Sequence, residues 1–233
     1  MGDKQPEETL ARSLCWHCES EVGGTYFCEQ CVKIQPIIPE ADHFSRFGLS
    51  RQLQIDSQDL ERRFYERSRK FHPDFYQQKS AEERDISLQN SALLNTAYRI
   101  LRDPFRRVEY LIRLEEGAAK EIPAKAPPEL LEEVMELQER LESFREHGPA
   151  GSAADREKIL SEEKELEARR ERLEKELFGF FEAWDRLAET SPGEKDKRKA
   201  TLVRMRDLLS ERTYITNLID TIKTTLSGAG SRV

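Results

Sequence analysis

Apolar residues recur at helical spacing in the middle of the chain. In residues 56–71 the stripe consists of Leu60, Phe64 and Phe71, and Ile55-Asp56 precedes it as an apolar residue and a potential N-cap. In the next such segment Leu94, Tyr98, Leu101 and Phe105 follow one another at intervals of four, three and four residues. Asp103-Pro104 marks the end of that segment. The pattern predicts two helices separated by a polar loop.

Three longer segments carry stripes of the same kind. At about 129–146 the stripe is Leu130, Val134, Leu137, Leu141 and Phe144. At about 155–189 it is Ile159, Leu166, Leu173, Leu177, Phe180, Trp184 and Leu187, and at about 197–226 it is Leu208, Ile215, Ile219, Ile222 and Leu226. Breaks rich in Gly, Pro and Ser separate the segments at 147–151 and 191–193. Three amphipathic helices with short connections predict an antiparallel three-helix bundle. A homodimeric coiled coil through the second helix is the alternative, because only its one stripe is apolar.

The segments between the predicted helices indicate the domain organisation. Residues 115–128 have the composition of a linker, with Pro123, Pro127 and Pro128, and Pro36 and Pro39 mark a second connection at 32–41. We expect a cysteine module at 10–35, a helical domain at 41–114, the linker at 115–128, and the bundle at 129–227. With 36% charged and only 8% aromatic residues, the chain favours several modest cores over one large core. The expected fold class is mainly all-α, with a small N-terminal hairpin module.

The charge balance narrows the classes of function. A net charge of -7 and a sequence pI near 5.4 argue against a nucleic-acid partner, because phosphate binding needs a basic surface. No apolar run reaches about 18 residues, so no membrane partner is expected. The N-terminus is acidic, unlike a signal or transit peptide. We therefore expect a cytoplasmic location, or the mitochondrial matrix if the chain is a processed eukaryotic form.

All four cysteines lie in the first 31 residues, as Cys15-x2-Cys18 and Cys28-x2-Cys31. Each pair can present two sulfurs to one tetrahedral ion, and the nine residues between the pairs, with Gly23-Gly24 for a turn, are long enough to form a hairpin. This ligand set favours zinc, so we expect one structural zinc ion. Since four thiolates complete its shell, His17 is expected to be a bystander. Side chains expected to pack around the site are Trp16, Tyr26 and Phe27.

Other readings of these cysteines remain open at this stage. Two disulfides would suit a secreted chain, and no signal peptide is evident. A redox-active CxxC is a further alternative. A zinc-ribbon role in nucleic-acid binding would need a basic surface. Residues 10–33 offer only Arg12 and Lys33 against Glu19, Glu21 and Glu29.

The loop between the first two predicted helices contains Phe71-His72-Pro73-Asp74-Phe75. Proline has no N–H and pushes the preceding residue out of the α region, so the helix must end at Phe71. His72 and Asp74 flank this stiffened corner and can form directional, charge-assisted hydrogen bonds to a partner. An ordinary helix-ending proline with polar neighbours is the alternative reading.

This part of the chain resembles the J domain of DnaJ-class co-chaperones. Besides His72-Pro73-Asp74, the matching positions include the basic helix at 60–71 and, on either side of it, Asp42, Phe44, Phe47, Gly48, Leu49, Leu94, Asn95, Ala97, Tyr98, Leu101, Asp103, Pro104 and Leu111. Arg67 departs from the pattern, because it lies on the apolar stripe where the family usually carries Leu.

The resemblance implies that His72, Pro73 and Asp74 stimulate ATP hydrolysis by a DnaK-class chaperone. It also implies that the basic helix docks on the acidic surface of that chaperone. Arg62 and Arg69 point away from the apolar stripe, and Arg63 with Lys70 flank it, although such a run is usually only a solvated face. Nothing in the sequence indicates that the chain is itself an enzyme.

The whole arrangement, from about Cys15 to Ile222, resembles the HscB family of iron-sulfur cluster co-chaperones. The resemblance rests on the two CxxC pairs, the J-domain pattern, Arg107-x-x-Tyr110-Leu111, and the bundle sequence that begins at Leu131-Glu132-Glu133-Val134. No Gly/Phe-rich stretch and no repeated CxxCxGxG follow, as they would in a general DnaJ. The family implies that the bundle binds an IscU-type scaffold protein and delivers it to a DnaK/HscA-class ATPase. A general protein-folding co-chaperone is the competing function.

Two residues of the first bundle helix lie off its stripe. At 100° per residue Leu131 lies about 100° round from Leu130, and Met135 lies one turn further on the same line. This ridge either packs against other parts of the chain or forms an interface. The HscB resemblance implies the interface, with a scaffold-binding face made of Leu131, Met135, Glu136, Glu139 and Tyr214.

Overall fold

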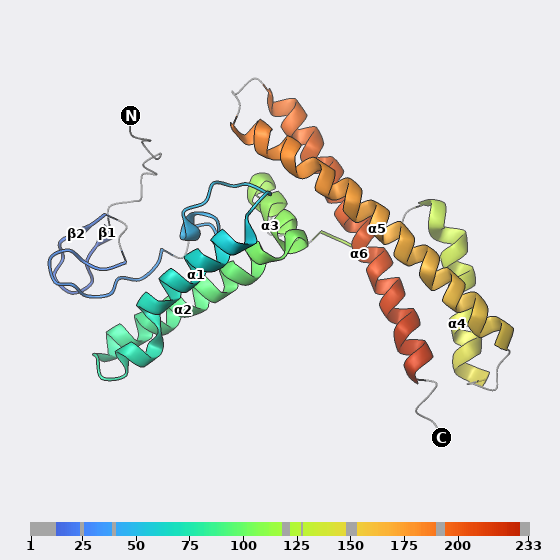
Figure 1. Cartoon of the computed structure of the whole chain (residues 1–233), viewed down its shortest axis with the longest axis horizontal. Coiled ribbons are helices and arrows are strands. Elements are labelled where there is room, and N and C mark those ends of the chain that lie inside the picture. The colour runs from blue at the N-terminus through green and yellow to red at the C-terminus, as the bar shows by residue number, and fades with distance from the viewer. Residues whose placement is uncertain are drawn as a thin grey trace. The chain divides into compact units, whose positions relative to one another are not determined.

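The computed structural model describes residues 13–23, 26–38, 41–117, 122–126, 128–147, 153–189 and 194–228. Outside these ranges lie several residues used above, namely Arg12, Gly24, Pro39, Pro127 and the breaks at 148–151 and 191–193. The chain is mainly helical (Figure 1) and divides into two compact units. The first unit ends at Pro104 but leaves out Gln52–Gln54, and these residues belong with Phe105 onwards in the second. This division into two units does not test the four segments expected from the sequence, and their boundaries stay predictions.

The first unit contains the N-terminal module and two long helices. Its elements are β1 (Ser13–Leu14), β2 (Glu21–Val22), the 3-10 helices η1 (Ser45–Phe47) and η2 (Pro73–Tyr76), α1 (Ser57–Phe71) and α2 (Ala81–Arg102). Asp56 caps α1 by accepting from the Gln58 amide at 2.8 Å. Ser80 and Glu83 form a capping box at the start of α2. The N-cap at Asp56 and the end of α1 at Phe71 are confirmed.

The core of the two-helix hairpin follows the stripes read from the sequence. Leu60 and Phe71 of α1, with Leu94 and Leu101 of α2, are almost fully buried. Phe64 stacks on Tyr98 with ring centroids 4.3 Å apart. The last carbonyl of α1, that of Phe71, accepts hydrogen bonds from the hydroxyls of Ser87 (2.6 Å) and Ser91 (3.0 Å). These bonds hold the end of α1 against α2 and satisfy an acceptor that the helix itself leaves open.

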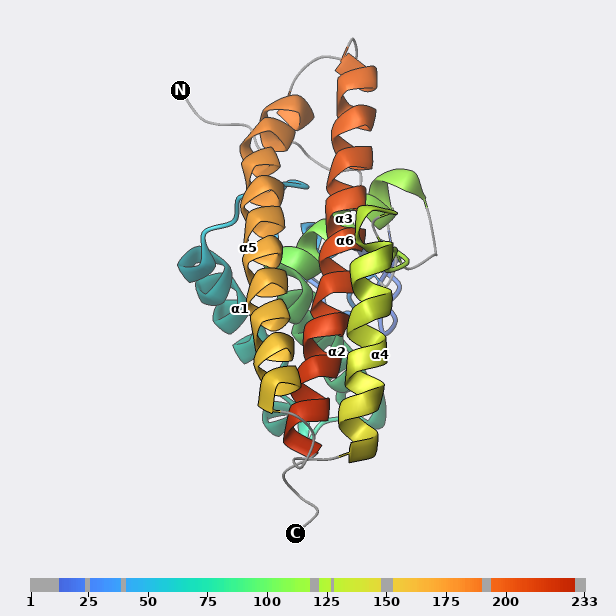
Figure 2. The same ribbon diagram turned by 90° about the vertical axis from the view of Figure 1, so that its right-hand side faces the viewer.

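The second unit contains α3 from Phe105 to its end, and then the bundle. α3 spans Pro104–Glu116, and η3 (Pro128–Leu130) leads into α4 (Leu131–His147), which is followed by α5 (Ala153–Glu189) and α6 (Lys195–Gly228). The three long helices lie side by side, with α5 and α6 in the most extensive contact (Figure 2). The predicted antiparallel three-helix bundle is confirmed. None of the described helices is both long and apolar enough to cross a membrane.

The bundle core corrects three residues of the predicted stripes, because Leu187 of α5 and Leu226 of α6 are only half-buried, as is Phe180. The neighbour of Phe180 in α5, Phe181, is buried instead. Residues three and four positions after Leu177 both satisfy helical spacing, so periodicity alone did not separate them. The stripe residues of η3 and α4 are all buried, as are Leu208, Ile215, Ile219 and Ile222 of α6. Trp184 is fully buried, with the guanidinium of Arg198 at 4.7 Å from its ring.

Candidate functional sites

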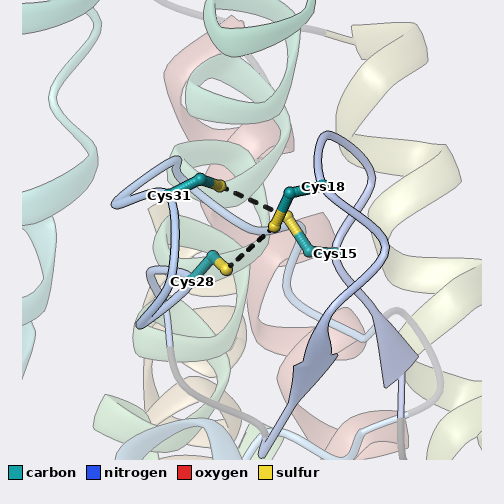
Figure 3. Close-up of side chains that lie close together, drawn as sticks. All are labelled: Cys15, Cys18, Cys28 and Cys31. Carbon is teal, nitrogen blue, oxygen red and sulfur yellow. Dashed lines mark hydrogen bonds between the residues drawn. The ribbon is translucent and has the colours of Figure 1, made fainter.

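The four cysteine sulfurs of the N-terminal module converge on one point (Figure 3). The Sγ atoms of Cys15 and Cys31 lie 3.6 Å apart, and so do those of Cys18 and Cys28. All four Sγ atoms lie within 4.8 Å of one another. Four sulfurs at about 2.3 Å from one tetrahedral ion would be about 3.8 Å apart, so the cluster fits this geometry. These four cysteines form a possible metal site.

Two matching backbone turns present the sulfurs. In the first, Cys15 N donates to Ser20 O (2.8 Å) and Glu19 N donates to Cys15 O (3.0 Å); in the second, Cys28 N donates to Lys33 O and Val32 N donates to Cys28 O, both at 2.9 Å. Glu19 and Val32, which follow the second cysteine of each turn, both have φ of 58°. A non-glycine residue in this left-handed region is uncommon, and for the β-branched Val32 it is strained. Each CxxC therefore sits in its own tightly folded turn.

The described strands of the module pair around each cysteine pair, whereas the turn expected at Gly23-Gly24 between the pairs lies partly outside the described residues. β1 and β2 pair on either side of Cys15 and Cys18, with Ser13 opposite Val22. A separate bridge joins Phe27 to Ile34 on either side of the second pair. The module thus contains two small hairpins, each with a cysteine pair at its tip. Sequence spacing alone did not show which residues pair, because such short strands carry no alternating pattern.

Hydrogen bonds lower the pKa of two thiols of this cluster, those of Cys15 and Cys28, whereas burial raises the pKa of the Cys31 thiol to about 12. The Cys15 sulfur accepts from the His17 amide (3.4 Å) and from the side-chain amide of Gln35 (3.3 Å). The Ser20 hydroxyl at 3.2 Å and the backbone amide of Cys31 lower the pKa of the Cys28 thiol to about 6. Metal binding requires deprotonated sulfurs, and the surroundings of Cys15 and Cys28 favour that form. The exposed His17 is not part of the cluster.

The sequence predicts that the aromatic residues of the module pack around the sulfurs, but not all of them do. Trp16 donates from Nε1 to the Ile34 carbonyl at 2.7 Å, which ties the first turn to the second. The ring of Tyr26 instead packs edge-on against Phe71 of α1, with centroids 5.0 Å apart. The residues buried with the cysteines include Val22. The expectation for Tyr26 was therefore wrong, because its ring packs on Phe71 and its hydroxyl bonds to Arg67 and to the Arg46 carbonyl.

The second site is the loop at the end of α1. His72 and Asp74 flank Pro73, and their side chains are 52% and 69% exposed. His72 Nδ1 accepts from the Asp74 amide at 3.4 Å and lies 3.4 Å from Asp74 Oδ2. Pro73 begins η2, where its missing N–H costs no helical bond. The exposed ring of Phe75 lies beside His72, a feature that the sequence analysis did not single out.

The four cations of α1 differ in their surroundings. Arg62 is exposed and pairs with Asp59 and Glu66 along the helix. Arg63 also pairs with Asp59, and it donates to the carbonyls of Phe47 (2.9 Å) and Gly48 (3.1 Å). Arg69 and Lys70 are exposed, and no ion pair to either is seen among the described residues. The basic surface next to the loop therefore consists chiefly of Arg69 and Lys70, and Arg63 braces η1.

The third site is the surface of α4. Leu131 and Met135 are 52% and 64% exposed, whereas Leu130 and Val134 beside them are buried. Glu136 and Glu139 are exposed on the same helix, and Tyr214 of α6 is half-buried. The second apolar ridge on α4 is thus solvent-facing within its unit and does not widen the bundle core.

A groove between α4 and α5 adjoins this ridge and was not foreseen from the sequence. It encloses about 340 Å³, and its lining includes Leu130, Glu136, Arg140, Glu162 and Arg169. Arg140 pairs with Glu136 (3.1 Å) and with Glu162 (2.8 Å), so it links the two helices across the groove. Burial raises the pKa of Glu162. Only the pairing of α4 with α5 brings these charges together.

Comparison with known proteins supports these observations. Residues 126–223 match the family described as "HSCB C-terminal oligomerisation domain". The chain is 32% identical over 217 residues to a mouse protein named "Iron-sulfur cluster co-chaperone protein HscB", a match that covers 90% of this chain and 81% of the mouse protein. A human protein of the same name is 36% identical over 135 residues, which is 54% of this chain and 56% of the human one.

Solved structures agree with the sequence comparison. The crystal structure of the human co-chaperone protein HscB matches with a TM-score of 0.67 and 26% identity, over 91% of this chain and 97% of the human chain. The chaperone HscB from Vibrio cholerae matches with a TM-score of 0.56 over 81% of this chain and 99% of the bacterial one; at 24% identity this likeness concerns the fold alone.

The exposed His-Pro-Asp loop between two antiparallel helices and the helical bundle together define a class, the J-domain co-chaperones. Within that class the comparisons indicate one family, since the match to the mouse HscB protein extends over most of both chains. This chain belongs to the HscB family of iron-sulfur cluster co-chaperones.

Proposed function

We propose that this protein binds an IscU-type iron-sulfur scaffold protein and stimulates the ATPase of a DnaK/HscA-class chaperone. The observation that carries the proposal is the exposure of His72 and Asp74 on a proline-stiffened corner next to exposed cations. A preformed, solvent-facing pair of this kind binds a partner with little loss of conformational entropy. The names of the relatives, which are co-chaperones and not enzymes, agree with this role.

The chaperone-binding surface in this proposal comprises His72, Pro73 and Asp74 with the cations of α1. Arg62, Arg69 and Lys70 supply the charge that attracts an acidic surface and raises the rate of association. Arg63 belongs to the surface in a supporting role, since its guanidinium binds the carbonyls of Phe47 and Gly48. We therefore expect Arg63 substitutions to affect stability as well as binding.

The scaffold-binding face consists of Leu131, Met135, Glu136 and Glu139 of α4, together with Tyr214 of α6. Two large apolar side chains more than half exposed on one helix are unusual without a partner, and the adjoining glutamates form a polar rim. A few such apolar and aromatic anchors carry most of the energy of a protein interface.

The metal of the N-terminal module, in this proposal, is one structural zinc ion held by Cys15, Cys18, Cys28 and Cys31. Zinc prefers four-coordinate sites, and a closed shell of four cysteines is typical of structural zinc. The ion would supply folding energy to a segment whose described strands, β1 and β2, are each two residues long.

The test measures ATP turnover by a purified DnaK-class chaperone with this protein alone, with an IscU-type scaffold alone, and with both. The expected result is stimulation by the protein alone and a larger, synergistic stimulation with both. A parallel capture experiment offers immobilised protein the scaffold and a set of unfolded polypeptides. Capture of unfolded chains with no preference for the scaffold would instead indicate a general folding co-chaperone.

A further inference from the structure

The N-terminal module is bonded to the helices of the first unit. The buried Asn90 of α2 accepts from the Ile37 amide (2.8 Å) and donates to the Gln35 carbonyl (2.9 Å). Lys33 forms an ion pair with Glu83 at 2.8 Å. A buried asparagine is costly to leave without hydrogen-bond partners, and its partners here come from another segment, so these bonds favour a docked module.

The docked segment is also bonded to the sulfur cluster. Gln35 donates from its side chain to Cys15 Sγ at 3.3 Å, and its backbone amide donates to the Tyr26 carbonyl at 2.9 Å. Its carbonyl is the one that accepts from Asn90. Gln35 thus connects the cysteine cluster, Tyr26 and α2 through a single residue.

Tyr26 lies against the end of α1 that precedes the His-Pro-Asp loop. Its ring packs at 83° on Phe71, the last residue of α1, which is fully buried. Its hydroxyl accepts from Arg67 Nε at 3.0 Å and donates to the Arg46 carbonyl at 3.3 Å. One ring therefore closes the packing around Phe71, the residue directly before His72.

The contacts of Arg67 account for an arginine at a position where the J-domain pattern has leucine. On the apolar stripe of α1 Arg67 is half-buried. Its guanidinium binds the Tyr26 hydroxyl and lies 5.8 Å from the centre of the Phe47 ring. A leucine here would pack but leave the Tyr26 hydroxyl without this donor. Arg67 is matched to a tyrosine supplied by the cysteine module.

We propose that Tyr26 and Arg67 are positioning residues through which the folded cysteine module holds the His72-Pro73-Asp74 loop in its binding conformation. The inference rests on the proposed ATPase stimulation and gives the metal module a part in it. Tyr26 is two residues from Cys28, in a segment whose described residues form one bridge, between Phe27 and Ile34. Without metal this segment loses its fold, and Tyr26 leaves Phe71.

The first test measures the loop directly in the full chain. Amide hydrogen exchange is followed in peptides covering residues 68–76 of wild type, Tyr26→Ala, Tyr26→Phe and Arg67→Leu. Exchange should rise about tenfold in Tyr26→Ala and less in the other two, which keep the ring. Leu14→Ala is the control, because that side chain lies in the same module and is 64% exposed. Its exchange should equal that of wild type.

The second test separates positioning from a loss of fold. In Tyr26→Ala we expect the loop to adopt its binding conformation only about a tenth of the time. The protein concentration for half-maximal ATPase stimulation then rises about tenfold, while the maximal stimulation stays unchanged. Chelation of the metal should produce the same shift in wild type. In Tyr26→Ala, chelation should raise the half-maximal concentration little further, since both changes remove the same contact between Tyr26 and Phe71.

The outcomes are distinct. Wild-type exchange and wild-type half-maximal concentration in Tyr26→Ala would overturn the inference, as would a full additional shift on chelation of that variant. Should Tyr26→Ala fail to fold, Tyr26→Phe and Arg67→Leu decide by the same two measurements. Absence of any stimulation by wild type would refute the proposed function, and the exchange data would still decide whether the module holds the loop.

Discussion

The ammonium of Lys33 lies 2.8 Å from a carboxylate oxygen of Glu83, fifty residues further along the chain. Glu83 is only 5% exposed, and its other role is in the capping box of α2. Burial raises the pKa of this carboxyl, but the bond from Lys33 and the amide of Ser80 outweigh burial and hold the pKa below the usual 4.5. One glutamate therefore joins the cysteine module to the start of α2.

Lys33→Met should make this coupling measurable through pH. A carboxyl whose pKa is lowered on folding contributes stability above its unfolded pKa of 4.5, and this contribution is lost as pH falls through the folded value. At pH 7 the variant should lose about 1 kcal/mol of unfolding free energy in urea. The difference from wild type should shrink below about pH 4. Lys197→Met, which removes an exposed i,i+3 pair, is the control and should stay within about 0.5 kcal/mol.

Removal of the metal should unfold the cysteine module and leave the helices. We expect one zinc ion per chain by elemental analysis, and loss of that zinc in Cys28→Ser. Apparent zinc binding energies of about 10 to 16 kcal/mol act as folding energy in small modules, so residues 13–38 should lose exchange protection while far-ultraviolet circular dichroism changes little. His17→Ala should keep its zinc. Purification under reducing conditions without any bound metal would contradict the assignment.

His72→Gln should abolish ATPase stimulation with the fold intact. The side chain is about half exposed, and its described contacts lie within the loop and to the Phe75 ring, so its loss should change the unfolding free energy by less than about 0.5 kcal/mol. Thermal melting and ATP turnover are measured on the same preparation. Full stimulation by a well-folded variant would refute the role of this loop.

A triple variant should bind the scaffold at least about thirtyfold more weakly, the effect of losing one interface anchor of about 2 kcal/mol. It combines Leu131→Ala, Met135→Ala and Tyr214→Ala. Isothermal titration with an IscU-type scaffold measures the affinity. Because Tyr214 is half-buried, the double variant of Leu131 and Met135 separates binding from stability.

Val203→Ala on α6, an apolar side chain that is 36% exposed, is the control for this experiment. The triple variant should still stimulate the chaperone alone but should lose the additional stimulation seen with scaffold. A markedly lower melting temperature of the double variant, or wild-type affinity of the triple variant, would show that the scaffold binds elsewhere.

The sequence by itself determined the features that depend on neighbouring residues. Apolar spacing, the N-cap Asp56 and the helix-ending Pro73 predicted the helices and the exposed corner between α1 and α2, because each follows from contacts within a few residues. The spacing of the cysteines likewise predicted one cluster, which the converging sulfurs support. The exposed ridge of Leu131 and Met135 followed from helical geometry alone.

The tertiary structure alone decided which partner each side chain meets. Phe181 replaced Phe180 in the core because both satisfy helical spacing, and only the packing of α5 in the bundle distinguishes them. The ring of Tyr26 packs on Phe71, and Arg67 donates to the Tyr26 hydroxyl; both contacts join residues about forty positions apart. Local periodicity contains no information about such pairs, because their energy depends on how two distant segments pack together.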